Sequence, residues 1–251
     1  MNTSKHDAQT ELDISLDAPL DELLDAAKQK YDLRFDPTKI GDTHLEILQI
    51  NDMPSYLDSL LHDLPPGAEF ELPLWAKMWP PAFMLSFFLQ RIPSQNQAGE
   101  PYTMLELGGG VGICGLFAAA AGFKVTITDI VPDALLFTRI NILHNGLEDR
   151  ATVCKADFLA DRLGKKFDYI VASDIIYGQP NLRPLVKFLL AHLASRPEAE
   201  VILAKGFRRN ASRFLGAAEK EFLISEKTIG IKSEDERHLT QIYRMRKRKN
   251  G

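Results

Sequence analysis

Apolar and polar residues follow two different patterns on either side of residue 70. Before it, residues 17–31 carry leucines at helical spacing behind a candidate cap at Asp17, and residues 44–50 alternate apolar and polar side chains like a half-buried strand. A turn rich in proline at residues 64–67 closes this part. The pattern predicts an N-terminal extension over residues 1–70 that contains helix and strand.

After residue 70 the pattern becomes a regular alternation of strands and helices. A strongly apolar helix with proline in its first turn comes first, at residues 80–92. Strands are then predicted at 103–107, 124–128, 151–155, 169–173 and 201–204, and helices at 113–121, 132–145, 182–193 and 212–222. Such alternation implies right-handed crossovers and a mostly parallel sheet that is covered on both faces.

The chain ends differently, with predicted strands at 223–231 and 238–245 separated only by a charged loop. Two strands joined in this way form an antiparallel hairpin. The expected fold class is therefore α/β. It is a Rossmann-like, doubly wound, mostly parallel seven-stranded sheet ending in an antiparallel hairpin, with an N-terminal α+β extension. The expected domains are residues 1–70 and 71–251.

A glycine-rich turn joins the first strand of this sheet to its helix, and two cofactor patterns fit it. Gly110, Gly112 and Gly115 satisfy G-x-G-x-x-G, which places a pyrophosphate on a helix N-terminus. Glu106, Gly108, Gly110 and Gly112 satisfy [D/E]-x-G-x-G-x-G, in which the acidic residue faces the ammonium group of S-adenosylmethionine. A carboxylate at Glu106 would repel a pyrophosphate, so the second pattern is favoured.

The ends of the next strands carry further candidate cofactor residues. Asp129 ends the second strand, where its carboxylate can accept hydrogen bonds from ribose hydroxyls in either cofactor class. After the third strand, Asp157 and Phe158 offer a carboxylate and an aromatic face to an adenine, although Asp157 could instead cap the following turn. Ile130 and Ser173 are assigned to the same S-adenosylmethionine site.

Four segments together resemble the class I, seven-strand S-adenosylmethionine-dependent methyltransferases. They are P-L-W-A-K-M-W-P at 73–80, the glycine turn at 105–112, F-D-Y-I-V-A-S-D-I-I-Y at 167–177, and I-Y-R-M-R at 242–246. Within that class they resemble the protein lysine methyltransferases of family 16, a branch that includes the lysine methyltransferase of the electron-transfer flavoprotein β subunit and its bacterial relatives. The resemblance covers residues 70–246, and it implies the sheet order 3-2-1-4-5-7-6.

The resemblance also implies roles for individual residues. Trp79 would line the cofactor pocket, while Asp174 and Tyr177 would be the catalytic pair at the substrate end. The motif departs from Asn-Pro-Pro-Tyr, which holds planar nitrogens, and the carboxylate of Asp174 instead suits an aliphatic amine. Packing roles remain open for Trp75, Trp79 and Tyr177. At position 158, phenylalanine stands where many family members have tryptophan.

Composition narrows the remaining classes. Residues 1–70 carry 15 acidic and 5 basic residues, so the net charge of −4 conceals −10 there and +6 elsewhere. This acidic segment is either a solvated face or a surface that attracts a basic partner. Two cysteines, no apolar run of ~20 residues and no metal-like histidine spacing predict a cytoplasmic protein without a metal or membrane span.

The predicted function is that of an S-adenosylmethionine-dependent N-methyltransferase, acting on a lysine side chain of a protein substrate. We expect a monomer that binds no nucleic acid, with the basic segment at 244–249 forming a solvated tail. The alternatives are a small-molecule methyltransferase, a nicotinamide-dependent oxidoreductase and a non-catalytic module that binds the cofactor. Fold alone does not choose among them.

Overall fold

A computed structural model describes residues 14–62, 64–65, 67, 70, 72–176, 182–207, 210–232 and 237–248. Within that part of the chain, none of the helices combines the length and apolar character needed to cross a membrane. In chain order the elements are α1 (Leu20–Lys28), β1 (Leu33–Ile40), β2 (Thr43–Ile50), α2 (Met53–His62), the 3-10 helix η1 (Leu74–Ala76), α3 (Pro80–Leu89), β3 (Thr103–Leu107), α4 (Ile113–Ala120), β4 (Lys124–Asp129), α5 (Pro132–His144), β5 (Ala151–Lys155), β6 (Tyr169–Ser173), α6 (Arg183–His192), β7 (Glu200–Gly206), α7 (Ser212–Ala218), β8 (Phe222–Lys232) and β9 (Arg237–Lys247).

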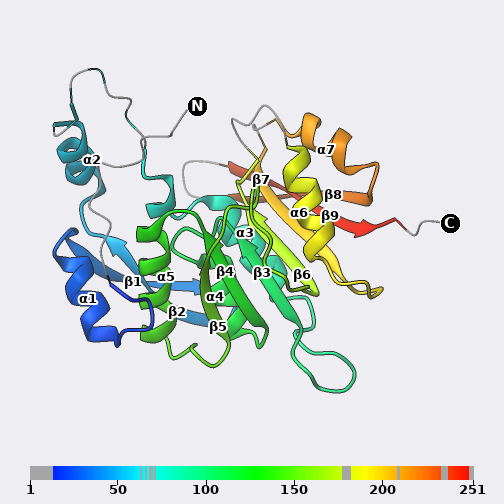
Figure 1. Cartoon of the computed structure of the whole chain (residues 1–251), viewed down its shortest axis with the longest axis horizontal. Helices are drawn as coiled ribbons and strands as arrows, with labels where there is room; N and C mark the ends of the chain where they lie inside the picture. Colours follow the sequence, from blue (N-terminus) through cyan, green and yellow to red (C-terminus); the bar gives the residue numbers. More distant parts are fainter. Residues whose placement is uncertain are drawn as a thin grey trace.

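The centre of the molecule is a seven-stranded sheet in the order β5-β4-β3-β6-β7-β9-β8 (Figure 1). The strands β3 to β7 run parallel, whereas β9 pairs antiparallel with both β7 and β8. Counted from β3, this is the order 3-2-1-4-5-7-6, so the predicted sheet order and the closing hairpin are confirmed. The predicted fold class is confirmed with them.

Helices cover both faces of this sheet, as the strand–helix alternation predicted. One buried apolar cluster joins α3, α4 and α5 to one face, and a second joins α6 and α7 to the other. The central strands are therefore buried on both sides, which explains why they read as nearly continuous apolar runs. The helix predicted at 212–222 is shorter than expected, because α7 ends at Ala218 and Phe222 already begins β8.

The N-terminal extension adds a separate two-stranded antiparallel sheet, β1–β2, on the side of α5 (Figure 1). The predicted helix and the strand β2 are confirmed, but β1 and α2 were not predicted. Asp17 is not the cap of α1, which begins at Leu20 after Pro19. Strand β1 was not predicted because its sequence includes Pro37, a residue that normally argues against a strand. Proline is tolerated there because β1 is an edge strand.

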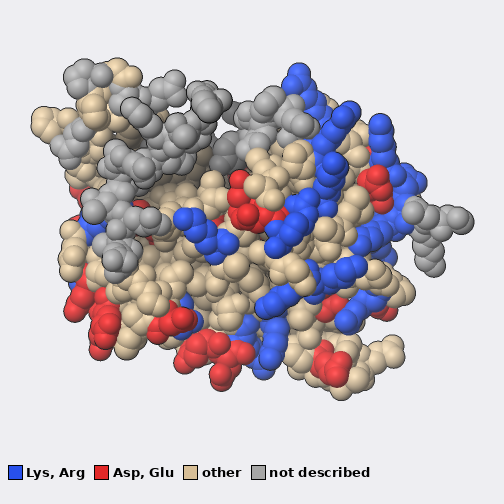
Figure 2. Space-filling view, viewed as in Figure 1, with Lys and Arg blue, Asp and Glu red and all other residues tan. Residues whose placement is uncertain are grey.

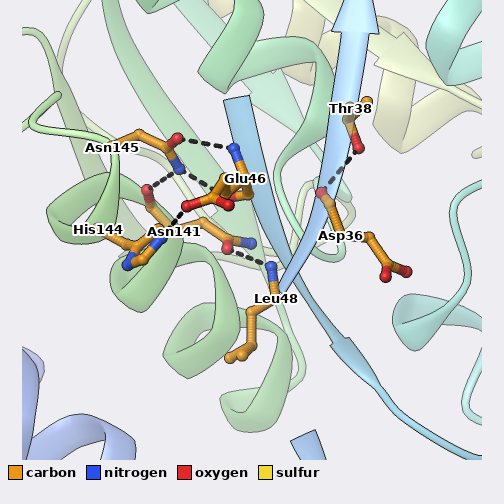
Figure 3. A network of polar contacts seen from close by, with 7 residues as sticks. All are labelled: Asp36, Thr38, Glu46, Leu48, Asn141, His144 and Asn145. Carbon is orange, nitrogen blue, oxygen red and sulfur yellow. Dashed lines mark hydrogen bonds and ion pairs between the residues drawn. The ribbon is translucent and has the colours of Figure 1, made fainter. Parts of the chain in front are cut away.

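Asn141 of α5 and Asn145, which caps the end of that helix, hydrogen-bond the free edge of β2 (Figure 3). The amide of Asn145 accepts a hydrogen bond from Glu46 N (2.9 Å) and donates one to Glu46 O (2.8 Å), as a neighbouring strand would. One turn earlier, Asn141 Oδ1 accepts from Leu48 N at 2.7 Å. Leu48 N, which would otherwise be buried without a partner, is thus satisfied by a side chain of the helix.

The extension shares its apolar core with the main sheet. Buried side chains of α1 and β2 belong to the same cluster as Phe137 of α5, and the ring of Tyr31 meets that of Phe137 edge-on at 5.3 Å between centroids. An ion pair adds to this packing, since Lys30 Nζ lies 2.7 Å from Asp133 Oδ2 in the first turn of α5. We therefore expect the extension and the sheet to unfold together.

Replacing Phe137 by alanine tests this shared core. The ring is fully buried between the two parts, so the cavity should lower the free energy of unfolding by about 3–5 kcal/mol in a single transition. Denaturant unfolding followed by circular dichroism measures the change. The control is Phe87→Ala on α3, where the ring is exposed and the expected loss is much smaller. A separate early transition of the extension would contradict the expectation.

Candidate active site

The turn between β3 and α4 is built from glycines in a left-handed conformation. Gly108, Gly110 and Gly112 have φ angles of 60°, 57° and 87°, a region that other residues rarely adopt. Gly110 is also confined by its surroundings, because a Cβ atom there would lie 2.7 Å from the carbonyl oxygen of Trp75. The predicted glycine turn is therefore present, and at Gly110 only glycine fits.

Helix α5 supports this turn from the side through two polar residues that the sequence patterns did not single out. Thr138 Oγ1 donates a hydrogen bond to Gly110 O at 2.7 Å, and Asn141 Nδ2 donates one to Val111 O at 3.0 Å. Both side chains are buried. A buried hydroxyl or amide in an otherwise apolar helix was the available signal, because buried polar groups require partners.

Glu106 lies behind the turn, on β3, and is only 2% exposed. Its Oε2 accepts a hydrogen bond from Gly115 N of α4 at 2.7 Å, so the carboxylate ties the strand to the helix after the turn. Burial raises the pKa of Glu106 to about 7, against the opposing effect of the Gly115 N–H. Contact with the ammonium group of a cofactor stays a prediction.

Asp129 at the end of β4 reaches back to the same turn. Its Oδ2 accepts from Gly110 N at 2.9 Å and its Oδ1 from Val131 N at 3.0 Å, while burial raises its pKa. Each carboxylate oxygen retains a second acceptor site, which is the chemistry that a ribose diol requires. The neighbouring Ile130 is 54% exposed and provides an apolar surface beside the carboxylate. These groups fit the ribose and adenine of S-adenosylmethionine.

The segment after β5 shows the alternative role that was considered for Asp157. Its Oδ1 accepts a hydrogen bond from Leu159 N at 2.7 Å, which caps the following turn. Asp157 N in turn donates to Asp161 Oδ2 at 2.7 Å. Phe158 is half-buried and packs against the cluster around α6 and α7. Their contacts with adenine stay predictions.

Asp174 follows β6 in an unusual backbone conformation, since its φ of 53° is the one positive value at a non-glycine residue in the described part of the chain. Its N–H donates to Ala204 O at 2.8 Å, and its Oδ1 accepts from Gly206 N at 3.0 Å. Contacts with the end of β7 thus hold a conformation that costs free energy, as is common at functional sites.

The Asp174 segment also touches the glycine turn. A Cβ atom on Gly108 would lie 2.9 Å from Cγ2 of Ile175, so the residue after Asp174 packs directly against the turn. Ser173, at the end of β6, pairs in register with Ala204. The structure therefore brings Asp174 and Ser173 to the same sheet edge as the glycine turn. Tyr177 lies outside the described residues.

The two tryptophans before α3 differ in their surroundings. Trp75 packs edge-on against Phe137 at 5.0 Å between ring centroids, which is the packing role that the sequence left open. Trp79 is half-buried, donates from Nε1 to Leu74 O at 2.9 Å, and has Lys77 Nζ 4.8 Å from its ring centroid. A role for Trp79 in lining the cofactor pocket stays a prediction.

Lys205, near the end of β7, is a buried lysine that sequence reasoning missed. Its Nζ donates to the side-chain carbonyl of Gln241 on β9. Burial lowers the pKa of Lys205, whereas the nearby carboxylates of Glu226 and Asp174 raise it. The available signal was a lysine directly after the apolar run of a predicted buried strand, a position where a charged side chain needs a partner. Among the described residues, no cluster of three or more histidine, cysteine or acidic side chains could hold a metal ion.

The surface charge is divided between the two sides of the molecule (Figure 2). Lysine and arginine gather over α6 and the β8–β9 hairpin, whereas acidic side chains gather at the opposite side, around α1 and the lower end of α5. In this view the two kinds of charge are thus concentrated over different elements.

The parallel sheet, its closing hairpin, the glycine turn and the acidic strand ends define a class I S-adenosylmethionine-dependent methyltransferase, with S-adenosylmethionine as its cofactor. Solved structures agree on the fold. The S-adenosylmethionine-dependent methyltransferase of Agrobacterium tumefaciens aligns with a TM-score of 0.59 at 17% identity, covering 84% of this chain and 69% of that one.

Sequence comparison then gives the family. Residues 74–221 match a family described as lysine methyltransferase, and this chain belongs to that family. EEF1A lysine methyltransferase 3 of Mus musculus is 32% identical over 178 residues, which are 69% of this chain and 72% of the mouse protein. Protein N-lysine methyltransferase METTL21A of Xenopus tropicalis is 30% identical over 62% of this chain and 72% of its own length.

Replacing Gly110 by alanine tests the turn. The left-handed φ and the approach to Trp75 O should distort the turn and weaken binding of S-adenosylhomocysteine by about tenfold, as measured by titration calorimetry. Gly216→Ala in α7 is the matched control, because no atom lies within 4 Å of the added Cβ. Equal affinities for the two variants would contradict the role of Gly110.

The raised pKa of Glu106 predicts a pH dependence of stability. The folded protein retains a proton up to pH about 7 that the unfolded chain releases near pH 4.5. The contribution of Glu106 to the free energy of unfolding should therefore fall as pH rises between these values and level off above them. Glu106→Gln keeps an acceptor for Gly115 N–H and cannot ionise, so denaturant unfolding from pH 4.5 to 8 should show a smaller fall. Identical profiles for wild type and variant would exclude this ionisation.

Proposed function

We propose that this enzyme is a protein-lysine N-methyltransferase in which Asp174 engages the target amine. The observation that carries the proposal is the position of Asp174, held with a left-handed backbone against the end of β7 and next to the glycine turn. In open α/β sheets, ligands bind at the carboxyl ends of the strands, where this residue lies. The relatives named above support lysine as the acceptor by their names.

The cofactor supplies an activated methyl group, so the residues of this chain mainly bind, orient and exclude water. We assign Asp129 to the ribose hydroxyls, Ile130 and Phe158 to the adenine, and Glu106 to the amino acid end. Trp79, Ser173 and the turn glycines Gly108, Gly110 and Gly112 complete the proposed cofactor contacts. The exposed apolar surface of Ile130 beside the two-oxygen acceptor Asp129 supports this arrangement.

Lysine arrives as an ammonium ion, which must release a proton to solvent water before its nitrogen lone pair can attack the methyl group. The carboxylate of Asp174 would hold the ammonium first and then orient the neutral amine through a hydrogen bond. Its Oδ1 is already fixed by Gly206 N–H, so its orientation is set before the substrate arrives. Tyr177 would shape the entry to this position.

We further propose that residues 71–251 form the catalytic domain and that the acidic residues 1–70 contribute to the choice of protein substrate. The charge division of the surface supports this, because an acidic extension attracts a basic protein segment (Figure 2). The name of the mouse relative specifies EEF1A as its target and the name of the Xenopus relative specifies no protein, so the substrate of this chain is a matter for experiment.

A labelling experiment tests the proposal. The purified enzyme is incubated with S-adenosylmethionine carrying a radioactive methyl group and with a cell extract, and the proteins are separated on a gel. Asp174→Asn is the test variant, since asparagine adopts left-handed backbone more readily than most residues and so removes the charge without adding strain. Turnover should fall by about 100-fold or more, while the affinity for S-adenosylhomocysteine stays within twofold of wild type.

A discrete labelled protein that is lost with Asp174→Asn would support the proposal, and amino acid analysis should then find methyl-lysine. Near-normal turnover in this variant would remove Asp174 from the mechanism. Labelled metabolites without labelled protein would identify a small-molecule methyltransferase instead. Cofactor binding without transfer to either kind of acceptor would identify a non-catalytic module.

A further inference from the structure

We propose that Asn141 is a positioning residue that couples the N-terminal hairpin β1–β2 to the glycine turn, so that the extension helps to set the affinity for S-adenosylmethionine. The side chain lies on α5 and faces Leu48 of strand β2 (Figure 3). It also reaches Val111 of the glycine turn. This inference concerns cofactor binding and does not depend on which acceptor the enzyme methylates.

Both ends of the Asn141 amide are engaged, and with different parts of the chain. Its Oδ1 accepts a hydrogen bond from Leu48 N of β2 at 2.7 Å, and its Nδ2 donates one to Val111 O of the glycine turn at 3.0 Å. The side chain has no exposed surface, so water cannot replace either partner. A single buried amide thus joins two segments that are 63 residues apart in the sequence.

The chemistry of the two partners requires an amide at this position. A backbone N–H only donates and a carbonyl only accepts, so the orientation of the Asn141 side chain is determined by its surroundings. Aspartate would keep the acceptor for Leu48 N but place a carboxylate oxygen opposite Val111 O. Leucine, which is of similar size, would leave both partners unsatisfied.

Neighbouring contacts make the same connection by packing. The ring of Tyr31 in the extension lies 6.1 Å from that of Trp75, whose carbonyl oxygen lies over Gly110. Asn145, at the C-terminal cap of α5, offers an internal comparison. It binds Glu46 N and O of the same strand and makes no contact with the glycine turn among the hydrogen bonds of the described residues. The two asparagines therefore differ in one respect: Asn141 contacts the glycine turn, and Asn145 does not.

The matched variants are Asn141→Asp and Asn145→Asp. Asn141→Asp loses the donor to Val111 O, whereas Asn145→Asp loses the donors to Glu46 O and Asn141 O. Of these three carbonyls, only that of Val111 belongs to the turn. Asn141→Asp should raise the dissociation constant for S-adenosylmethionine, and its KM, by about tenfold, as expected for one unsatisfied buried acceptor. Its kcat at saturating cofactor should stay within twofold of wild type. Asn145→Asp should bind the cofactor as wild type does, with a lowered melting temperature only.

A second measurement requires no variant. Coupling between two sites is reciprocal, so a ligand in the cofactor site should also stabilise the strand. Hydrogen–deuterium exchange of the full-length wild-type protein, with and without saturating S-adenosylhomocysteine, should show at least about fivefold slower exchange of the Leu48 amide with the ligand bound. The exposed helix α2 provides the internal reference, where exchange should not change.

Three outcomes would overturn the proposal. One is wild-type affinity for the cofactor in a folded Asn141→Asp protein. Another is an equal loss of affinity in Asn141→Asp and Asn145→Asp, which would indicate general destabilisation. The third is exchange at Leu48 that does not respond to the ligand, and this result decides the question even if Asn141→Asp fails to fold. Slower exchange at Leu48, together with a selective effect on KM in Asn141→Asp, supports it.

Discussion

The active site depends on one backbone constraint, namely that the chain must turn from β3 into α4 within the five residues Gly108 to Gly112. Left-handed glycines make the turn possible, but they do not determine where it lies. Its position comes from hydrogen bonds with Asp129 at the next strand end and with Thr138 and Asn141 on α5. Glu106 binds α4 just after the turn, and the Trp75 carbonyl leaves no room for a side chain at Gly110. A flexible sequence is thereby held in one conformation.

Two of those partners lie on α5, which also binds the N-terminal extension. The extension is therefore linked to the residues that hold the glycine turn. The hairpin β1–β2 binds α5 through hydrogen bonds, and its buried apolar residues belong to the same core as that helix. The division of the chain at residue 70 is therefore clearer in the sequence than in the packing.

The sequence was most informative where local pattern and burial agree. Strands buried on both faces and helices ended by Gly122 or Gly146 were predictable from residue 101 onward, and so were the acidic strand ends Glu106 and Asp129. Strand β1 was not, because an edge strand need not alternate strictly and this one contains a proline. Thr138, Asn141 and Lys205 could be noticed as polar residues in largely apolar segments, but their roles could not be predicted. Each depends on a partner that only the tertiary fold brings near.

The closing hairpin has a consequence for how copies of this protein behave in a crowded solution. Strand β8 is eleven residues long and lies at the edge of the sheet, so its outer backbone groups are a template for another strand. Its exposed stretch carries Ser225, Glu226 and Lys227, and charged side chains oppose the stacking of like edges. The charged residues of β8 therefore reduce the tendency of this edge strand to pair with the edge strand of another copy.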